Sequence, residues 1–287
     1  MRVLKEQRVE IFEDTRAIYN SNEFLIKSIK DSKQNQKVIL EKDIIETTED
    51  KFTEDAKVIV SKSRTLEAAS KYKNEKVAIL NFASATNAGG GVIRGSSAQE
   101  ECLCRCSTLY PCISDFSVTS KFHQKHKIYL KEGQMTAIYN DDCIFTPDVT
   151  VFKSDTDYPE LLPENKWYSV DVISCAAPNL RFKPSNGMNP DSGERVKVTD
   201  KELLEIHIKR LTRILDIATA NKNEVIILGA FGCGAFKNNP SVVAEASARV
   251  IKKYLKKFKV IEFAIYCSDR DTVKYDTFNR RLSKVGR

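Results

Sequence analysis

The chain has 287 residues, of which 41% are hydrophobic, and this length suits one large α/β domain or one domain with a smaller accessory region. The sequence has no run of about eighteen apolar residues, and its charged beginning has no apolar segment, so we expect neither a membrane span nor secretion. The formal net charge of +7 fits an anionic partner such as a nucleotide or a polymer with a phosphate backbone, although solubility alone explains it equally well.

The first 55 residues contain one clear helical pattern. An amphipathic helix is predicted over residues 2–19, because apolar residues recur there with helical spacing. These apolar positions include Val9, Phe12, Ile18 and Tyr19. The pattern over residues 20–55 is weaker, and its apolar stretches at 24–29 and 37–42 favour two short strands.

From about residue 57 onward, short apolar stretches alternate with helical patterns. Strands are predicted over residues 58–60, 77–80, 143–152, 169–177, 225–228 and 260–267. Helices are predicted over residues 65–73, from about 97, and over 199–222, 241–257 and 271–284. Strands that are apolar on both faces and alternate with helices imply a mostly parallel sheet covered on both sides.

Two segments between the later strands have distinct characters. The helix over residues 199–222 has the clearest pattern, and Thr199 with Glu202 predicts a capping box at its start. Residues 181–197 are polar and rich in Pro, Gly and Asn, which predicts a long surface loop. Whether this loop closes over a ligand stays open.

Glycines gather in two short stretches that follow buried strands. Seven of the eleven lie there: Gly89, Gly90, Gly91, Gly95, Gly229, Gly232 and Gly234. Both stretches lie at the carboxyl ends of predicted parallel strands, where such sheets bind ligands. Backbone N–H groups without side chains in front of them can approach phosphate, so two such loops suggest a diphosphate. Two ordinary turns are the alternative, and neither stretch has the spacing of a P-loop or of a dinucleotide motif.

Gln99, Glu100 and Glu101 open the helix that follows the first glycine stretch. Ser97 with Glu100 forms a possible capping box, and Ser96 with Gln99 is a second possibility. Neighbours on a helix diverge by about 100°, so we expect one acid to face the loops and the other to cap the helix or face solvent. An acid beside a diphosphate makes sense if it binds sugar hydroxyls or donates a proton, and the phosphate would favour its protonated form.

The eight cysteines do not indicate disulfides or a metal centre. An intracellular chain of this size favours reduced thiols. Four cysteines cluster in the pattern C-x-C-x-C-x5-C, which is not a usual zinc spacing. They are Cys102, Cys104, Cys106 and Cys112. We therefore expect no metal and no cofactor.

The stretch NFASATNAGGGVIRGSSAQEECLCRCSTLYPCI, residues 81–113, resembles the microbial-type poly(ADP-ribose) glycohydrolases. Their signature is a glycine triplet, a short spacer and then Gln-Glu-Glu. Residues 143–155, 172–181 and 228–240 resemble the same family, so the similarity covers nearly the whole chain. Ala88 departs from the pattern, since the family often has proline there, but no functional group is lost.

The resemblance implies a three-layer α/β/α macrodomain with a mostly parallel mixed sheet and an N-terminal accessory helical region. The expected division is 1–56 for the accessory region and 57–287 for the catalytic domain. It implies ADP-ribose bound with its diphosphate between the two glycine loops. Glu101 would be the catalytic acid, Glu100 would bind ribose hydroxyls and Gln99 would support that network.

The resemblance also implies a set of substrate-binding residues. Asn87 would contact the distal ribose, and Phe231 would order the ribose near the scissile bond, unless it is plain core. The full set is Asn87, Gly89, Gly90, Gly91, Gln99, Gly229, Phe231, Gly232, Cys233, Gly234 and Phe236. The sequence does not place the residues that contact adenine.

The activity implied is hydrolysis of the ribose–ribose O-glycosidic bonds of poly(ADP-ribose), which releases ADP-ribose. Removal of a single ADP-ribose from protein or nucleic acid is an alternative, as is a non-enzymatic ADP-ribose-binding macrodomain. The expected partners are poly(ADP-ribose) or ADP-ribosylated macromolecules, with no membrane. We expect a monomer in the cytoplasm, or in the nucleus if the source is eukaryotic.

Overall fold

The computed structural model describes residues 3–46 and 48–285 and contains one seven-stranded mixed sheet. Its strand order is β1-β4-β5-β3-β6-β7-β2. The strands are β1 (Lys37–Ile39), β2 (Lys57–Ser61), β3 (Val77–Phe82), β4 (Cys143–Val151), β5 (Tyr168–Cys175), β6 (Val225–Leu228) and β7 (Val260–Ala264). The pairs β1–β4 and β4–β5 are antiparallel and the other four pairs are parallel, so the prediction of a mostly parallel mixed sheet is confirmed.

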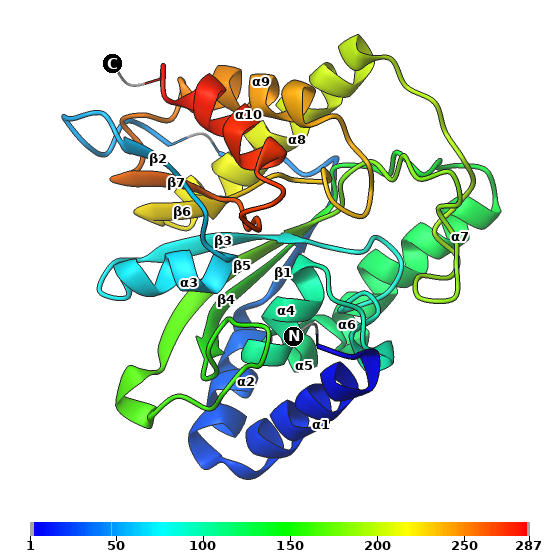
Figure 1. The fold of residues 1–287 in the computed structure, drawn as a ribbon, viewed down its shortest axis with the longest axis vertical. Coiled ribbons are helices and arrows are strands. Elements are labelled where there is room, and N and C mark those ends of the chain that lie inside the picture. The colour runs from blue at the N-terminus through cyan, green and yellow to red at the C-terminus, as the bar shows by residue number, and fades with distance from the viewer. Residues whose placement is uncertain (1–2, 47, 286–287) are drawn as a thin grey trace.

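Helices cover both faces of this sheet (Figure 1). On one side lie α8 (Asp200–Ala220), α9 (Pro240–Ile251) and α10 (Val273–Leu282). On the other lie α1 (Lys5–Ser21), α2 (Glu23–Asn35), α3 (Thr65–Ala69), α4 (Gln99–Cys106), α5 (Leu109–Ile113), α6 (Phe116–Thr119) and α7 (Lys125–Lys131). The three-layer α/β/α arrangement is therefore confirmed.

Two hydrophobic cores follow from the alternation of side chains along the strands. In β3, Leu80 packs with the core beneath α8, α9 and α10, whereas its neighbour Ile79 packs with the core beneath α3, α4 and α5. Phe12 of α1 belongs to the second core, and it is fully buried. Strands that are buried on both faces explain the continuous apolar runs seen in the sequence.

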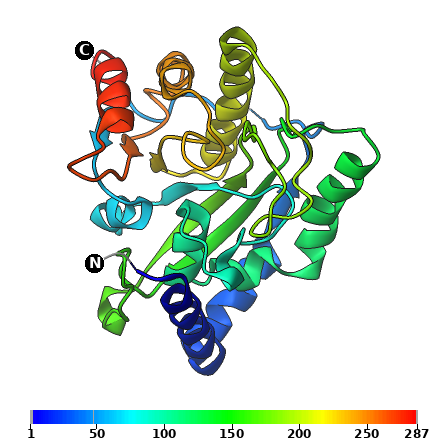
Figure 2. The same ribbon diagram turned by 45° about the vertical axis from the view of Figure 1, so that its right-hand side comes forward.

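Lys153, which follows β4, ties the N-terminal helix to the rest of the fold. It is only 2% exposed, and its Nζ atom lies 2.6 Å from Asp14 Oδ2 and 2.9 Å from Thr15 Oγ1. Figure 2 shows α1 and α2 beside each other below the sheet. The division at residue 56 stays a prediction, and β1, from the expected accessory region, forms an edge strand of the sheet.

The prediction of a strand over residues 24–29 is wrong, because this segment lies in α2. Asn22 caps that helix by accepting a hydrogen bond from Leu25 N, and Leu25 and Ile29 pack on one face at helical spacing. The strand predicted over residues 37–42 is confirmed only for its first three residues, which form β1.

The remaining predicted elements are present with shifted ends. The helix predicted over 2–19 begins at Lys5, and residue 2 lies outside the described residues. The helix predicted over 241–257 ends at Ile251, after which the chain turns. The capping box of α8 is confirmed, since Glu202 N donates to Thr199 Oγ1 at 3.2 Å and Thr199 N donates to Glu202 Oε2 at 2.7 Å.

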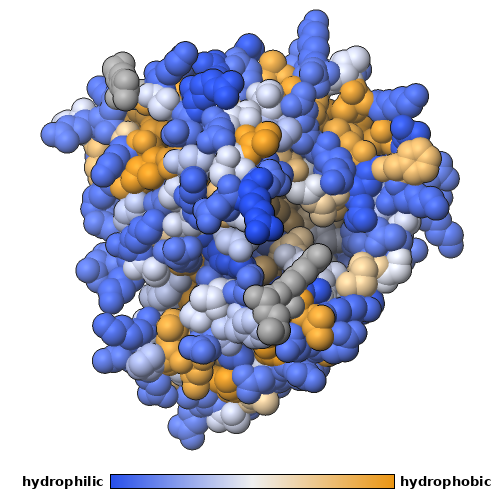
Figure 3. Space-filling model, viewed as in Figure 1, coloured by the Kyte–Doolittle hydropathy of each residue, from blue (hydrophilic) through white to orange (hydrophobic). Residues whose placement is uncertain are grey.

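In the described part of the chain, no helix is both long and apolar enough to cross a membrane. The face shown in Figure 3 is mainly hydrophilic, with hydrophobic residues in small groups.

Candidate active site

A cavity of about 760 Å³ opens at the carboxyl ends of β2, β3, β6 and β7. Residues that directly follow these strands line it, among them Ser63, Ser84, Ala230 and Tyr266. The start of α4, the start of α1 and the segments 155–159 and 181–197 also contribute to its wall. The cavity therefore lies where parallel sheets bind ligands, as the two glycine stretches predicted.

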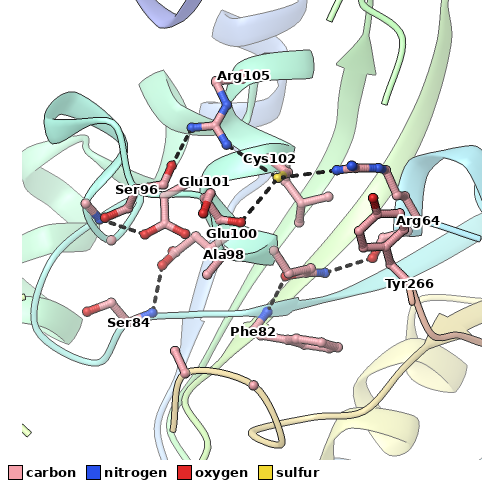
Figure 4. A pocket seen from close by; sticks show the side chains of 18 of the residues that line it. Arg64, Phe82, Ser84, Ser96, Ala98, Glu100, Glu101, Cys102, Arg105 and Tyr266 are labelled. Carbon is pink, nitrogen blue, oxygen red and sulfur yellow. Dashed lines mark hydrogen bonds between the residues drawn. The ribbon is translucent and has the colours of Figure 1, made fainter. Parts of the chain in front are cut away.

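The first glycine loop lies directly against the two acids (Figure 4). Gly90 has a φ of +59°, and a Cβ atom there would lie 2.6 Å from Glu101 Oε1 and 3.2 Å from Glu100 Oε2. A side chain at position 90 would thus displace the carboxylates. The two acids therefore require a glycine at position 90, whether or not a ligand also lies against the loop.

Main-chain and side-chain donors fix the two carboxylates. Glu100 accepts hydrogen bonds from Ser84 N at 2.8 Å and from Asn81 Nδ2 at 3.3 Å, one on each oxygen. Glu101 Oε1 accepts from Gly91 N at 2.9 Å. Its other oxygen, Oε2, is buried and has no hydrogen-bond partner among the described residues.

Burial raises the pKa of both acids. The pKa of Glu100 is raised to about 8 by desolvation and by the neighbouring Glu101, against the opposing effect of its hydrogen bonds. Desolvation also raises the pKa of Glu101, while the Gly91 N–H and the Arg105 guanidinium act in the opposite direction. A pair of this kind holds a proton near neutral pH, which is what a general acid needs.

Both predicted capping boxes at α4 are wrong. The helix begins at Gln99 with Ala98 in the N-cap position, and no side chain caps it. The expectation that one acid would cap the helix or face solvent is also wrong, because both Glu100 and Glu101 are buried in the cavity wall. Contacts with β3 and with the glycine loop replace the local cap.

Gln99 anchors α4 to β3. Its Oε1 accepts a hydrogen bond from Phe82 N at 2.9 Å, and its Nε2 donates to Leu80 O at 2.8 Å. This side chain thereby pairs with the main chain of β3 and fixes the distance between the start of α4 and the sheet. Its contacts fit a supporting role, as the resemblance implied.

The second glycine loop contributes part of its predicted residues to the cavity. Gly232, Gly234 and Phe236 line it. A Cβ atom on Gly229 would lie 2.8 Å from Ala264 O, so that glycine permits the loop backbone to pack closely against the end of β7. Cys233 is buried and its thiol is directed to the carbonyl of its own loop at Phe231.

Phe231 is fully buried in the core below α8 and does not line the cavity. Its ring lies 5.6 Å from the ring of Phe82 and 5.8 Å from that of His207. The placement favours the alternative that Phe231 is a core residue. Phe236, five positions later, is the aromatic residue of this loop that reaches the cavity.

Asn87 holds the segment 181–197 against the first glycine loop. Its Nδ2 donates to Asn189 Oδ1 at 2.8 Å and to Pro190 O at 3.1 Å. Arg94 donates from Nη2 to Met188 O at 2.5 Å. The predicted surface loop therefore forms one wall of the cavity. Gly89 does not line the cavity, and it packs against the ring of Tyr110.

Arg64 and Tyr266 are cavity residues that the sequence analysis missed. The Arg64 guanidinium lies 4.0 Å from the ring centroid of Tyr266, and the tyrosine is 56% exposed. Figure 4 places this pair at the opposite end of the site from Ser96 and Glu101. Both follow strands at their carboxyl ends, so the rule that located the glycine loops could have found them.

Among residues 3–46 and 48–285, no group of three or more His, Cys, Asp or Glu side chains is arranged to hold a metal ion. The cysteines described there are free thiols.

Similarity to known proteins identifies the class of enzyme. The chain belongs to the family described as microbial-type PARG, catalytic domain, which matches residues 5–154. PARG is poly(ADP-ribose) glycohydrolase, and the chain is an enzyme of that type. The resemblance seen in the sequence is thereby confirmed.

Solved structures of bacterial PARGs share the fold over nearly the whole chain. The PARG of Thermomonospora curvata is 25% identical with a TM-score of 0.81, covering 96% of this chain and 99% of that one. The PARG of Deinococcus radiodurans in complex with ADP-ribose is 26% identical with a TM-score of 0.72, covering 89% and 96%. No curated protein matches the chain.

Proposed function

We propose that the enzyme hydrolyses the ribose–ribose bonds of poly(ADP-ribose) with Glu101 as the general acid and Glu100 as the residue that positions ribose hydroxyls. The observation that carries this assignment is the unequal bonding of the two carboxylates. Both oxygens of Glu100 accept hydrogen bonds, which suits an ionised group, whereas Glu101 Oε2 has no partner among the described residues. A proton on that oxygen can be donated to substrate.

The pKa shifts are compatible with this assignment when the acids are treated as a pair. The carboxylates of Glu100 and Glu101 both lie beside Gly90, and repulsion between two negative charges there opposes ionisation of both groups. The pair therefore titrates as a unit and retains one proton. The donors around Glu100 favour its ionised form, and this leaves the proton on Glu101.

Substrate placement follows from the chemistry of the cavity wall. The backbone at Gly234 can approach a diphosphate, because the space in front of this glycine is open. Gly232 also lines the cavity, but a Cβ atom there would lie 2.7 Å from Ala177 Cβ, so packing requires that glycine. Phe236 offers an apolar face to the ribose beside the scissile bond. Tyr266 with Arg64, at the far end of the site, offers an aromatic surface on which adenine can stack.

The reaction then needs one acid and the substrate's own phosphate. Glu101 protonates the oxygen that leaves with the departing ribose, and positive charge develops at the anomeric carbon. The diphosphate of the bound ADP-ribose stabilises that charge. The ionised Glu101 next accepts a proton from water, which attacks the anomeric carbon and completes hydrolysis. General acid–base assistance of this type contributes about 10²–10⁴-fold.

The structures of the Deinococcus radiodurans PARG in complex with ADP-ribose support the same ligand here. Cleavage of single ADP-ribose units from protein or nucleic acid uses the same acid and the same ligand, so it remains the second candidate. A macrodomain that only binds ADP-ribose does not need a buried pair of acids at the ribose, so the non-enzymatic alternative is disfavoured. We also propose that the enzyme acts as a cytoplasmic monomer.

The substrate class is tested by incubating the pure enzyme with labelled poly(ADP-ribose) and, in parallel, with mono-ADP-ribosylated protein and DNA. Release of ADP-ribose from the polymer with little release from the other two supports the proposal. The reverse pattern assigns the enzyme to the second class. ADP-ribose is expected to raise the melting temperature, because it binds only the folded state.

A further inference from the structure

The first turn of α1 lies directly against the end of the first glycine loop. Arg8 donates from Nε to Gly95 O at 2.6 Å and from Nη1 to Val3 O at 2.6 Å. Gly95 has a φ of +73°, and a Cβ atom there would lie 2.3 Å from Lys5 O. The loop and the N-terminal helix are thus in backbone contact, and only glycine permits it.

A second arginine holds the next carbonyl of the same loop. Arg105 of α4 is 3% exposed, and its Nη1 donates to Ser96 O at 2.7 Å (Figure 4). The main-chain carbonyl of Arg105 in turn accepts a hydrogen bond from Thr15 Oγ1 of α1 at 2.7 Å. Two guanidinium groups from two helices therefore hold the consecutive carbonyls of Gly95 and Ser96, and both arginines line the cavity.

The two held carbonyls are connected to the acid by a short path. Ser96 N donates to Gly91 O at 3.1 Å, and a Cβ atom on Gly91 would lie 2.3 Å from Ser96 Oγ. The position of Ser96 therefore fixes that of Gly91. The N–H of Gly91 is the donor that orients the Glu101 carboxylate. A shift at Gly95 or Ser96 would reach Glu101 through these two contacts.

We propose that Arg8 is a positioning residue for the hydrolysis, and that with Arg105 it fixes Gly95 and Ser96 so that the Gly91 N–H holds Glu101 in its productive orientation. The inference rests on the proposed role of Glu101. It makes the N-terminal helix part of the catalytic apparatus, not only a cover for the core. A misplacement of about 1 Å in a reacting group can reduce turnover about 10²-fold, so indirect support of this kind is significant.

The test compares Arg8→Met with Arg16→Met. Arg16 lies on the same helix, is exposed and pairs with Glu13, so it controls for loss of an arginine from α1. We expect Arg8→Met to lower kcat on poly(ADP-ribose) about 10-fold. ADP-ribose affinity by calorimetry should stay within about 2-fold, because the diphosphate contacts that we propose are in the second glycine loop. Arg8→Lys, which retains a donor, should recover part of the loss, and Arg16→Met should match the unmodified enzyme.

A double-mutant cycle with Glu101→Gln shows whether Arg8 acts through the acid. In the Glu101→Gln background, Arg8→Met is expected to cost less than about 2-fold in the residual turnover, since no productive acid remains to be oriented. An equal loss in both backgrounds would overturn the proposal and assign Arg8 a general structural role. Unchanged kcat in Arg8→Met, or in Arg8→Ala if the methionine variant does not fold, would also overturn it.

Failure of this inference is distinguishable from failure of the proposed function. Normal turnover by Glu101→Gln alone would remove Glu101 from the chemistry, whatever Arg8 does. Loss of turnover in Glu101→Gln with normal turnover in Arg8→Met would leave the acid in place and remove only the positioning role.

Discussion

The backbone N–H of Gly91 donates a hydrogen bond to Glu101 Oε1 at 2.9 Å, so the glycine triplet orients the catalytic acid that we propose. The triplet and the Gln-Glu-Glu sequence are therefore one structural unit. The glycines leave room for two carboxylates, and the loop backbone supplies the donor that holds one of them. This explains why a backbone without side chains precedes a pair of acids in the chain.

The two acids should respond differently to replacement by glutamine. Glu101→Gln is expected to lower turnover on poly(ADP-ribose) by about 10²-fold or more, because an amide cannot deliver the proton. Affinity for ADP-ribose, measured by calorimetry, should hold, since glutamine is nearly isosteric with the protonated acid and is uncharged like it. Glu100→Gln should cost less in turnover and act mainly on KM, because an amide keeps part of the hydrogen bonding to ribose.

Near-normal turnover by Glu101→Gln would contradict the assignment. If Glu100→Gln were the inactive variant instead, the roles of the two acids would be reversed.

Gly90→Ala should impair catalysis through the acids. The added Cβ atom would lie 2.6 Å from Glu101 Oε1, so the carboxylate or the loop must move. We expect turnover to fall by about 10-fold or more, as for other misplaced catalytic groups. Gly133→Ala is the matched control, because Gly133 also has a positive φ, of +70°, but has open space around it. Equal turnover in the two variants would show that Gly90 does not constrain the acids.

Replacement of Phe231 should mainly reduce stability, whereas replacement of Phe236 should mainly reduce activity. Phe231→Ala removes a fully buried ring and is expected to cost about 3–5 kcal/mol of unfolding free energy. Phe236→Ala should leave the melting temperature closer to that of the unmodified enzyme while raising KM or lowering kcat, because its ring lines the cavity. Denaturant unfolding and polymer hydrolysis of both variants provide the measurement. A kinetic defect confined to Phe231→Ala would instead support the role that the resemblance implied for Phe231, which is to order the ribose near the scissile bond.

A strong chelator should leave turnover unchanged. In the described residues no side chains are grouped to hold a metal, and the proposed reaction uses a carboxylic acid and the substrate's phosphate. The assay is polymer hydrolysis after incubation with EDTA and removal of the chelate. Loss of activity that added Mg²⁺ or Zn²⁺ restores would contradict the metal-free mechanism.

The sequence predicted features that depend on neighbouring residues and missed features that depend on the fold. Thr199 and Glu202 are three residues apart, and their capping box forms as predicted. The same pattern at Ser97 and Glu100 fails, because Glu100 bonds instead to Ser84 and Asn81, which lie far along the chain. Such tertiary contacts are not visible in local spacing.

Two further errors have the same origin. The apolar stretch over residues 24–29 is too short for periodicity to distinguish a strand from a helix, and the cap at Asn22 decides in favour of a helix. In the second glycine loop, spacing alone does not determine which phenylalanine faces the cavity. The packing of Phe231 against His207 on α8 determines it.

The raised pKa of Glu100 predicts that stability falls as pH rises. An unfolded glutamate releases its proton near its ordinary pKa of 4.5, whereas in the folded protein the pair of Glu100 and Glu101 retains one proton up to about pH 8, the raised pKa of Glu100. Between these values the folded state binds more protons, so the free energy of unfolding declines with pH, by at most about 1.4 kcal/mol per pH unit for one proton. Below pH 4.5 both states are protonated and the decline disappears.

Glu100→Gln should therefore gain stability relative to the unmodified enzyme as pH rises from 5 to 8. The amide places an N–H beside Ser84 N or Asn81 Nδ2, and this adds a penalty that does not depend on pH. The informative quantity is accordingly the change with pH of the difference in unfolding free energy, measured by denaturant titration. Glu10→Gln, at an exposed position on α1, is the control and should show no such change. A difference for Glu100→Gln that is constant between pH 5 and 8 would show that Glu100 does not increase the number of protons that the pair of acids holds in the folded enzyme.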